Sequence, residues 1–587
     1  MTLPLSNPAP SRFMQLAFAG CVLLYGVLVL IGFNDIEEDA FIYFRFAANI
    51  ADGYGYVFNI GGERIESCSG PLWLLLVTLL SKLPINLVLS TKLLCFVLGV
   101  LCIRQVLLLS QRFVADRILA IFPALLMIVS IPFYTWSMRG LETASYWLVF
   151  LWLLEWVTNP ARIRHWWLPA VCLVNSRPEG FFMLAAVVPY LFFFEKNNSR
   201  FWPNAIIVVS AMLAVLLWRF WYFHDLVPHP FYLKINSDHA HYARNLLVYG
   251  WYSGWPLLLL LALPGLLRGG RRADVALAGC LLLALLWNVF VFEDKVYNRH
   301  IGLSLPFFYM TTLMLVARWF PQSGIPHLLL RAVLSVLVVF TLLYSRYVHF
   351  DDSHPAPFIN NAQRAVLQAD EYWPELWRLV KNPDHYRESP DRVDVFSIRY
   401  SLIAAVGDFV KLNYRDDAVV VYDQIGQAPW YAGRNTFFID NIGLGYRELG
   451  FARFHEFAEN SWLYSSFENV RESMLRYFWP TEQRIFTDDQ MIDRILEKNP
   501  VAIIARKGMI NNGRVSFLSV MLKRADVAAH YQARYLLNNR EIIFERMQAR
   551  DDYRRHVDDV FVVPEGSRVQ KITAFSWCKD SICMDLE

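Results

Sequence analysis

Charge is scarce in this sequence. Only 18% of its 587 residues are Asp, Glu, Lys or Arg, and the formal net charge at pH 7 is +3. No face concentrates enough Lys and Arg to neutralise a phosphate backbone, so no nucleic-acid partner is expected. The sequence also lacks internal repeats and low-complexity tracts, so a repeat architecture is not expected.

The eight cysteines show no metal-binding spacing. Cys578 and Cys583 lie close together near the C-terminus and can form a disulfide if that end is extracytoplasmic. No cleavable signal is indicated at the N-terminus, because Arg12 is followed directly by a long apolar run that predicts a retained first span. The other cysteines in apolar runs are interpreted as small core residues: Cys21, Cys95, Cys102, Cys172 and Cys280.

What the sequence has in abundance is apolar residues, at 56% hydrophobic and 16% aromatic content. This composition is typical of a polytopic α-helical membrane protein with a soluble part. Runs of spanning length predict transmembrane helices, because a helix satisfies its own backbone in lipid. The shorter run Pro71–Leu83 predicts a helix in or against the outer interface. About eleven spans are predicted: Phe13–Phe33, Ile85–Leu109, Ile118–Phe133, Thr143–Val157, Trp166–Val174, Phe181–Phe194, Ala205–Tyr222, Leu246–Leu267, Val275–Phe292, Ile301–Val316 and Leu328–Tyr344.

The distribution of basic residues predicts the orientation of these spans. With the N-terminus inside, every inner connection is short and basic, whereas the outer connections are mixed in sign and richer in acids, His and aromatics. An odd number of spans then places the C-terminal part outside the membrane. The inner connections hold Arg112 and Arg117, Arg162 and Arg164, Lys196 and Arg200, Arg268, Arg271 and Arg272, and Arg318.

The composition becomes polar after Tyr344. We therefore divide the chain into a transmembrane catalytic domain, residues 1–346, and an extracytoplasmic soluble domain, residues 347–587. Short β-type runs alternate with helix-like stretches such as Asp489–Glu497, which predicts a mixed α/β fold. The predicted strands are Ala418–Tyr422, Thr436–Ile439, Val501–Ala505, Glu541–Phe544 and Val560–Val563.

Four carboxylates, those of Asp35, Glu37, Glu38 and Asp39, follow the first apolar run. They fit an ordinary acidic, solvated helix start, and they also fit a reaction site at the membrane surface. A carboxylate can accept the proton of an attacking hydroxyl, and cations can stabilise a phosphate leaving group. Mixed charges recur in the outer connections, as expected for a lipid-phosphate donor: Arg139 with Glu142, Arg177 with Glu179, Asp294 with Arg299, and Asp225 with Lys234.

Several blocks then occur in a specific order along the chain. Glu38-Asp39-Ala40-Phe41 is followed by Gly53-Tyr54-Gly55 and Glu63-Arg64-Ile65-Glu66, and later by Arg177-Pro178-Glu179-Gly180. Next come Asp225-Leu226-Val227-Pro228 with Tyr232 and Lys234, Glu293-Asp294 with Arg299, and Asp423, Gly426, Tyr431 and Asp440 to Leu444. Together these blocks resemble GT-C fold glycosyltransferases, and most of all the AftB-type arabinofuranosyltransferases of mycobacterial cell-wall assembly. This sequence departs from the family's motifs at several positions, such as Glu38 for the first Asp, His224 for a Gly and His229 for an Asn. These departures bear on the identity of the sugar and acceptor more than on the type of reaction.

The resemblance implies roles for individual residues. Asp39 would be the catalytic base, and Glu38 would orient it or help hold a divalent cation, Mg²⁺ or Mn²⁺, together with Asp39. We interpret Asp35 and Glu37 as acidic residues of a charged, solvated helix start. The donor phosphate and substrate would contact Lys234, Arg299, His300, Arg177, Tyr232, Asp225 and Asp294.

The alternative to phosphate contact for the cationic residues is contact with lipid headgroups or structural ion pairing with Glu179, Asp225 and Asp294. We favour the structural pair for Arg177, since Arg177 and Glu179 flank Pro178 in a tight turn. Trp73, Trp136 and Tyr134 are either sugar-stacking or ordinary interfacial aromatics.

The leading hypothesis is a glycosyltransferase in the bacterial cytoplasmic membrane with its soluble domain in the periplasm. It would move a sugar, arabinofuranose by resemblance, from a polyprenyl-phosphate donor to a glycan or to a surface protein such as a pilin. Alternatives are mannose, glucose or aminoarabinose as the sugar, or a lipid-linked-sugar transporter. A transporter predicts ionisable residues in mid-span, and the sequence shows few of them.

Overall fold

The computed structural model describes the chain in segments. These are residues 11–31, 36–159, 163–195, 200–226, 228–230, 255–267, 279, 305–320, 323–344, 398–440, 443–446, 473, 477–478, 487–506, 517–547, 567–577 and 582–586. Five predicted site residues lie outside these segments: Tyr232, Lys234, Asp294, Arg299 and His300. The predicted span Val275–Phe292, apart from one residue, the strand Val560–Val563, and Cys578 also lie outside them.

The N-terminal part consists of helices, as its long apolar runs predict. Among the described residues, four of them are long and apolar enough to cross a membrane, namely α1, α4, α10 and α17. The count of eleven spans stays a prediction. The helices of this part are α1 (Arg12–Ile31), α2 (Glu38–Ala51), α3 (Pro71–Leu80), α4 (Leu87–Phe113), α5 (Phe122–Val129), α6 (Ile131–Trp136), α7 (Thr143–Thr158), α8 (Trp167–Val174), α9 (Glu179–Glu195), α10 (Phe201–Phe223), α13 (Trp255–Leu267), α16 (Leu305–Trp319) and α17 (Gly324–Tyr344).

The predicted span Ile118–Phe133 is not one helix. It is divided between a short 3₁₀ turn, α5 and α6. Ser130 between α5 and α6 has extended backbone angles (φ −75°, ψ 132°), and Pro132 follows within the first turn of α6. Because proline has no N–H to donate to the preceding turn, the helix stops and starts again at this position.

Close packing joins α1 to α4. The ring of Tyr25 stacks on Phe96 with centroids 5.5 Å apart, and its hydroxyl donates to Ser137 Oγ at 2.8 Å. Gly99 makes this approach possible, since a Cβ at that position would overlap the Tyr25 ring. A small residue that lets two helices approach closely, together with a hydrogen bond between helices, is typical of helix packing inside a membrane.

The C-terminal part contains a mixed sheet with the order β2-β1-β3-β5-β4-β6-β7. The strands β2, β1 and β3 are parallel, and the remaining neighbours are antiparallel. Four of the predicted strands occur as β1, β2, β3 and β5, whereas the sequence did not predict β4, β6 or β7. The strands are β1 (Val419–Val421), β2 (Phe437–Ile439), β3 (Ala502–Arg506), β4 (Tyr531–Leu537), β5 (Glu541–Arg546), β6 (Val569–Trp577) and β7 (Ile582–Leu586).

Helices cover both faces of this sheet. Successive side chains of a strand point to opposite faces, so Val421 packs with α24 (Asp488–Glu497), α25 (Phe517–Lys523) and α26 (Ala525–His530). Val420 packs on the other face with α20 (Ile398–Asn413) and α21 (Gln427–Ala432). The buried side chains around Val420, α20 and α21 form one continuous cluster with those of the helices α1 to α10.

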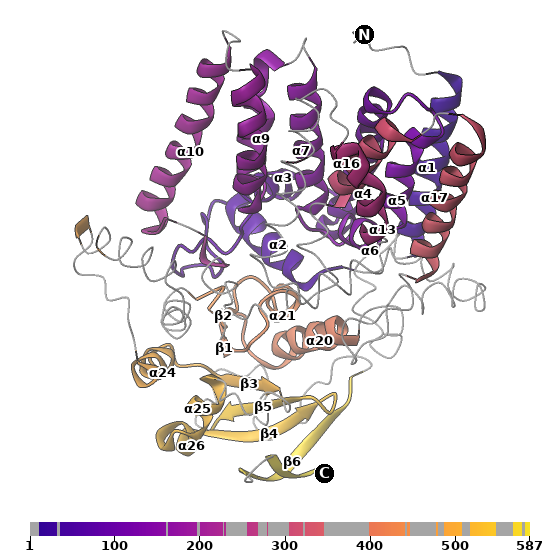
Figure 1. Cartoon of the computed structure of the whole chain (residues 1–587). Coiled ribbons are helices and arrows are strands. Elements are labelled where there is room, and N and C mark those ends of the chain that lie inside the picture. Colours follow the sequence, from indigo (N-terminus) through magenta and orange to yellow (C-terminus); the bar gives the residue numbers. More distant parts are fainter. Residues whose placement is uncertain are drawn as a thin grey trace.

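Figure 1 shows the resulting arrangement of the two parts. Long helices such as α4, α9 and α17 gather at one end, and β3 to β6 lie at the other. Between them lie α2, α21 and β2. The N-terminal turn of α2, which carries Glu38 and Asp39, is therefore at the junction between the membrane-type helices and the sheet domain.

Candidate active site

Three consecutive carboxylates at the start of α2 lie in three different environments. Glu37 is buried and pairs with Arg139, with Oε2 at 3.2 Å from Nη1. Glu38 is buried, and its Oε1 accepts a hydrogen bond from the backbone N–H of Gly426 in the soluble part. Asp39 alone of the three is partly exposed. The solvated interpretation of Glu37 is therefore wrong, because its carboxylate is needed to neutralise a buried arginine.

The connection before α7 fixes this turn of α2 from the membrane side. The backbone N–H of Glu37 donates to the carbonyl of Arg139 at 3.0 Å. Gly140, at φ +83°, passes so close that a Cβ there would lie 3.2 Å from the Cβ of Ala40. The carbonyl of Gly140 also accepts from Trp73 Nε1 at 3.3 Å. These contacts hold the first turn of α2 on the side of the connection between α6 and α7.

The aromatic residues proposed for sugar stacking are part of this packing. Trp73, Trp136 and Tyr134 are all buried. The ring of Trp136 lies under the guanidinium of Arg139, 5.1 Å from its centroid. None of these three rings offers an exposed face to a sugar, so the stacking interpretation is wrong for them.

The loop after α2 carries buried polar residues, among them Glu66 and Cys68. Burial, reinforced by the negative charges of Glu142, Glu66 and Asp39, raises the pKa of the Cys68 thiol well above its usual value. Tyr43, one turn after Asp39, accepts the N–H of Gly70 at its hydroxyl, at 3.0 Å. The loop after α2 and this helix thus form a frame of buried polar groups.

Arg177 belongs to this frame as a structural ion pair. It donates two hydrogen bonds to Glu179, at 3.1 and 2.8 Å, and a third to Glu142. All three side chains are buried. The predicted pair of Arg177 with Glu179 is confirmed. Arg139 contacts Glu37, and Glu142 contacts Arg177.

A second buried ion pair joins the loop after α2 to the end of α10. Arg219 Nε lies 2.9 Å from Glu66 Oε2, and Nη2 lies 2.9 Å from Oε1. Asp225 is also buried and accepts the N–H of Leu226 at 2.7 Å. Burial, partly offset by Arg219 and reinforced by Asp225, raises the pKa of Glu66 to about 7. The sequence marked Glu66 only as a motif residue and did not predict its partner.

Two residues that the sequence did not single out, Arg45 and Asn59, join α2 and the loop after it to the soluble part. Arg45, wholly buried, donates to the carbonyls of Phe58 at 2.9 Å, Pro429 at 2.6 Å and Thr436 at 2.7 Å. The side-chain amide of Asn59 donates to the carbonyl of Phe438 at 2.8 Å and accepts its N–H at 3.0 Å. Asn59 thus pairs with β2 as a neighbouring strand would.

Asp440 lies at the end of β2 and orders the turn that faces this junction. Its carboxylate accepts the N–H groups of Leu444 at 2.7 Å and Gly445 at 2.8 Å. Burial outweighs these hydrogen bonds and raises the pKa of Asp440 to about 6. A Cβ on Gly445 would lie 2.8 Å from the ring of Phe58, so the turn packs directly on the loop after α2.

Metal binding at Asp39 and Glu38 stays a prediction. Within the described segments, no three His, Cys, Asp or Glu side chains group as a metal site would require. One carboxylate oxygen of Glu38 is already committed to the Gly426 N–H.

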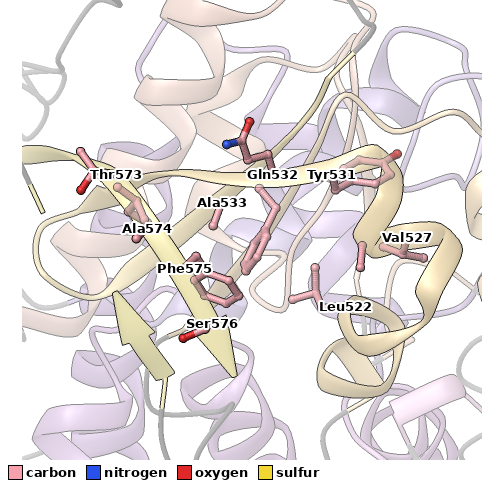
Figure 2. Close-up of a pocket in the computed structure, with 12 residues that line it drawn as sticks. Leu522, Val527, Tyr531, Gln532, Ala533, Thr573, Ala574, Phe575 and Ser576 are labelled. Atoms are coloured by element: carbon pink, nitrogen blue, oxygen red, sulfur yellow. The ribbon is translucent and has the colours of Figure 1, made fainter. Parts of the chain in front are cut away.

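A cavity of about 300 Å³ lies elsewhere in the soluble part. Figure 2 shows it between the segment of α25 and α26 and the strands, with Phe575, Leu522 and Tyr531 around it. It lies on the sheet face covered by α24, α25 and α26, opposite the face that packs toward α2. It is therefore not part of the Asp39 site.

Comparisons with known proteins identify the fold. No family model matches the sequence, and no curated protein matches it. The solved structure of ArnT from Cupriavidus metallidurans bound to undecaprenyl phosphate is similar, with a TM-score of 0.52 and 11% identity over 92% of this chain and 99% of that chain. Its apo structure is similar with a TM-score of 0.52 and 12% identity, over 91% and 97% of the two chains. The oligosaccharyltransferase of Archaeoglobus fulgidus gives a TM-score of 0.44 at 12% identity, over 92% of this chain and 74% of that chain.

The likeness to ArnT covers nearly the whole of both chains. ArnT has the GT-C fold. The chain therefore has the GT-C fold that the sequence resemblance predicted. The comparison carries no information on the sugar, so the likeness to AftB-type enzymes stays a prediction.

Proposed function

We propose that this chain is a membrane glycosyltransferase. It transfers a sugar from a polyprenyl-phosphate donor to a glycan or protein acceptor at the outer face of the bacterial cytoplasmic membrane. The observation that carries the proposal is the environment of Asp39, which is the partly exposed carboxylate in an otherwise buried and paired acidic turn. The shared fold with ArnT, whose structure holds undecaprenyl phosphate, supports this class of donor.

The chemistry assigned to Asp39 is general base catalysis. Its carboxylate takes the proton of the acceptor hydroxyl while that oxygen bonds to the anomeric carbon of the donor. The bond from this carbon to the phosphate oxygen breaks, and the lipid phosphate leaves with the electron pair. Lys234, Arg299 and His300 are proposed to stabilise the phosphate charge, and Tyr232, Asp225 and Asp294 to position the substrate. A divalent cation at Asp39 remains part of the proposal, to be tested by chelation.

The sugar is proposed to be arabinofuranose, on the resemblance to AftB-type enzymes. Mannose, glucose and aminoarabinose are the alternatives. The transporter hypothesis loses support, because Glu155 and Arg219 are engaged in ion pairs with Arg112 and Glu66 near helix ends. A transport pathway would need such groups in a central cavity.

The test is a transfer assay with the full chain in lipid nanodiscs. Labelled polyprenyl-phosphate sugars would be offered one at a time with a glycan and a peptide acceptor. Asp39→Asn is expected to lower kcat by about 10² to 10⁴. Its thermal unfolding should be unchanged, since Asp39 is partly exposed. Asp489→Asn, at an exposed carboxylate of α24, is the matched control and should retain full activity.

Each arm of this assay gives a distinct result. Turnover of arabinofuranose alone supports the leading sugar, and turnover of another sugar favours its alternative. Equal transfer by Asp39→Asn would show that Asp39 is not the base. No transfer from any lipid-linked sugar would contradict the proposed function.

A further inference from the structure

Two charged side chains of α2 contact the two ends of α21. Glu38, in the first turn of α2, accepts the N–H of Gly426, the residue that precedes α21. Arg45, two turns later, donates to the carbonyls of Pro429 at 2.6 Å and Gly433 at 3.1 Å at the other end of α21. The helix α2 thus contacts both ends of α21, which lies next to it in Figure 1.

The signs of these charges suit the ends that they contact. A helix has exposed N–H groups and positive potential at its N-terminus, and exposed carbonyls and negative potential at its C-terminus. The carboxylate of Glu38 meets the first end and the guanidinium of Arg45 meets the second. Both side chains are buried, so losing either bond would leave a charge in a site that water does not reach.

Gly426 is needed for this contact. A Cβ at position 426 would overlap the carboxylate and the backbone carbonyl of Glu38. Any other residue would therefore push the first turn of α2 away from α21. Asp39 is the next residue in that turn, so a shift of Glu38 moves Asp39 as well.

We infer that Glu38 is a positioning residue, which fixes the carboxylate of Asp39 by docking the first turn of α2 on Gly426 of the soluble domain. The inference rests on the proposed function, in which Asp39 is the base. It assigns Glu38 neither proton transfer nor cation binding. It also makes the soluble domain a structural part of the catalytic centre.

Paired variants of Glu38 test the inference by rescue. Glu38→Gln keeps a carbonyl oxygen that accepts the Gly426 N–H, so kcat should fall by no more than about tenfold, the difference between a charged and a neutral hydrogen bond. Glu38→Ala and Gly426→Ala should each lower kcat by about 100-fold through misplacement of the base, with the donor KM unchanged. If Glu38→Gln is as inactive as Glu38→Ala, the charge itself is required and the inference is wrong.

Hydrogen exchange gives a second readout that needs no turnover. Glu38→Ala and Gly426→Ala should speed exchange at the amides of residues 40–44, whereas Glu38→Gln should not. Arg434→Ala is the matched control, because Arg434, which follows α21, pairs with Asp52 at the exposed C-terminal end of α2. Unchanged exchange in both Glu38→Ala and Gly426→Ala would overturn the docking role. Absence of transferase activity in the unmodified chain would contradict the proposed function. Hydrogen exchange would then still decide whether Glu38 docks α2 on Gly426. Should Gly426→Ala not fold, the two Glu38 variants decide alone.

Discussion

Arg219 and Glu66 form a bidentate ion pair in which Nε and Nη2 each lie 2.9 Å from a carboxylate oxygen. The pair joins the last turns of α10 to the loop that follows α2. The backbone of the same loop residue accepts the N–H of His229 at 3.0 Å. One acidic residue thus connects α10, the loop after α2 and the connection that contains His229.

Arg219→Ala is expected to destabilise the protein. Removing one partner of a buried pair leaves the carboxylate of Glu66 uncompensated, which costs about 3–5 kcal/mol. Thermal unfolding in nanodiscs should show a clearly lower midpoint. Arg104→Ala, at an exposed position of α4, is the matched control. Equal midpoints for the two variants would show that the pair does not contribute to stability.

Asn59→Asp is expected to loosen the contact between β2 and the loop after α2. The change replaces the N–H donor that faces the carbonyl of Phe438 with an acceptor, at a cost of about 1–3 kcal/mol. Hydrogen exchange should become faster at residues 436–439. Asn539→Asp, at an exposed turn position, is the control and should leave this exchange unchanged. Slow exchange retained in Asn59→Asp would contradict the strand-like role of Asn59.

Stability of the sheet domain is expected to fall as pH rises toward 7. Burial, reinforced by Asp423 and offset by Arg506 and Arg540, raises the pKa of Glu541 to about 7. Between the unfolded pKa of 4.5 and about 7, the folded state binds more protons than the unfolded state. The stabilisation is therefore complete below pH 4.5 and is lost as pH passes through 7, by about 1 kcal/mol or more.

Glu541→Gln should remove most of this pH dependence. The glutamine keeps a carbonyl oxygen for the hydroxyl of Tyr422, which lies 3.3 Å from Glu541 Oε1. Urea unfolding between pH 4.5 and 8, followed by exchange in β3 and β5, measures the effect. The variant should retain only the slope due to Asp440, whose pKa is also raised. An unchanged slope would show that Glu541 is not the titrating group.

Arg177→Lys is expected to act on stability rather than on donor binding. Lysine keeps the charge but cannot make the bidentate contact with Glu179 together with the bond to Glu142, at a cost of about 1.5–3 kcal/mol. The unfolding midpoint should fall while the donor KM of the folded protein stays constant. A raised donor KM at an unchanged midpoint would instead assign Arg177 to the phosphate.

Much of the architecture follows from the sequence alone. Long apolar runs predict helices because lipid offers no partner for an unpaired backbone, and α1, α4, α10 and α17 appear close to their predicted bounds. Strands β1, β2, β3 and β5 follow from short runs of β-type residues. The missed strands β4 and β6 carry polar residues on exposed faces, as with Gln532 and Thr573, so their pattern in the sequence is weak.

The environment of each acid was decided only by the tertiary structure. Glu37, Glu38 and Asp39 are adjacent and chemically alike, so the sequence by itself determined only that an acidic turn follows the first apolar run. Arg139 and Gly426, about 100 and about 390 residues further along the chain, decided which carboxylates are buried. Burial and ion pairing depend on such distant contacts, because the free energy of a charge is set by the groups folded around it.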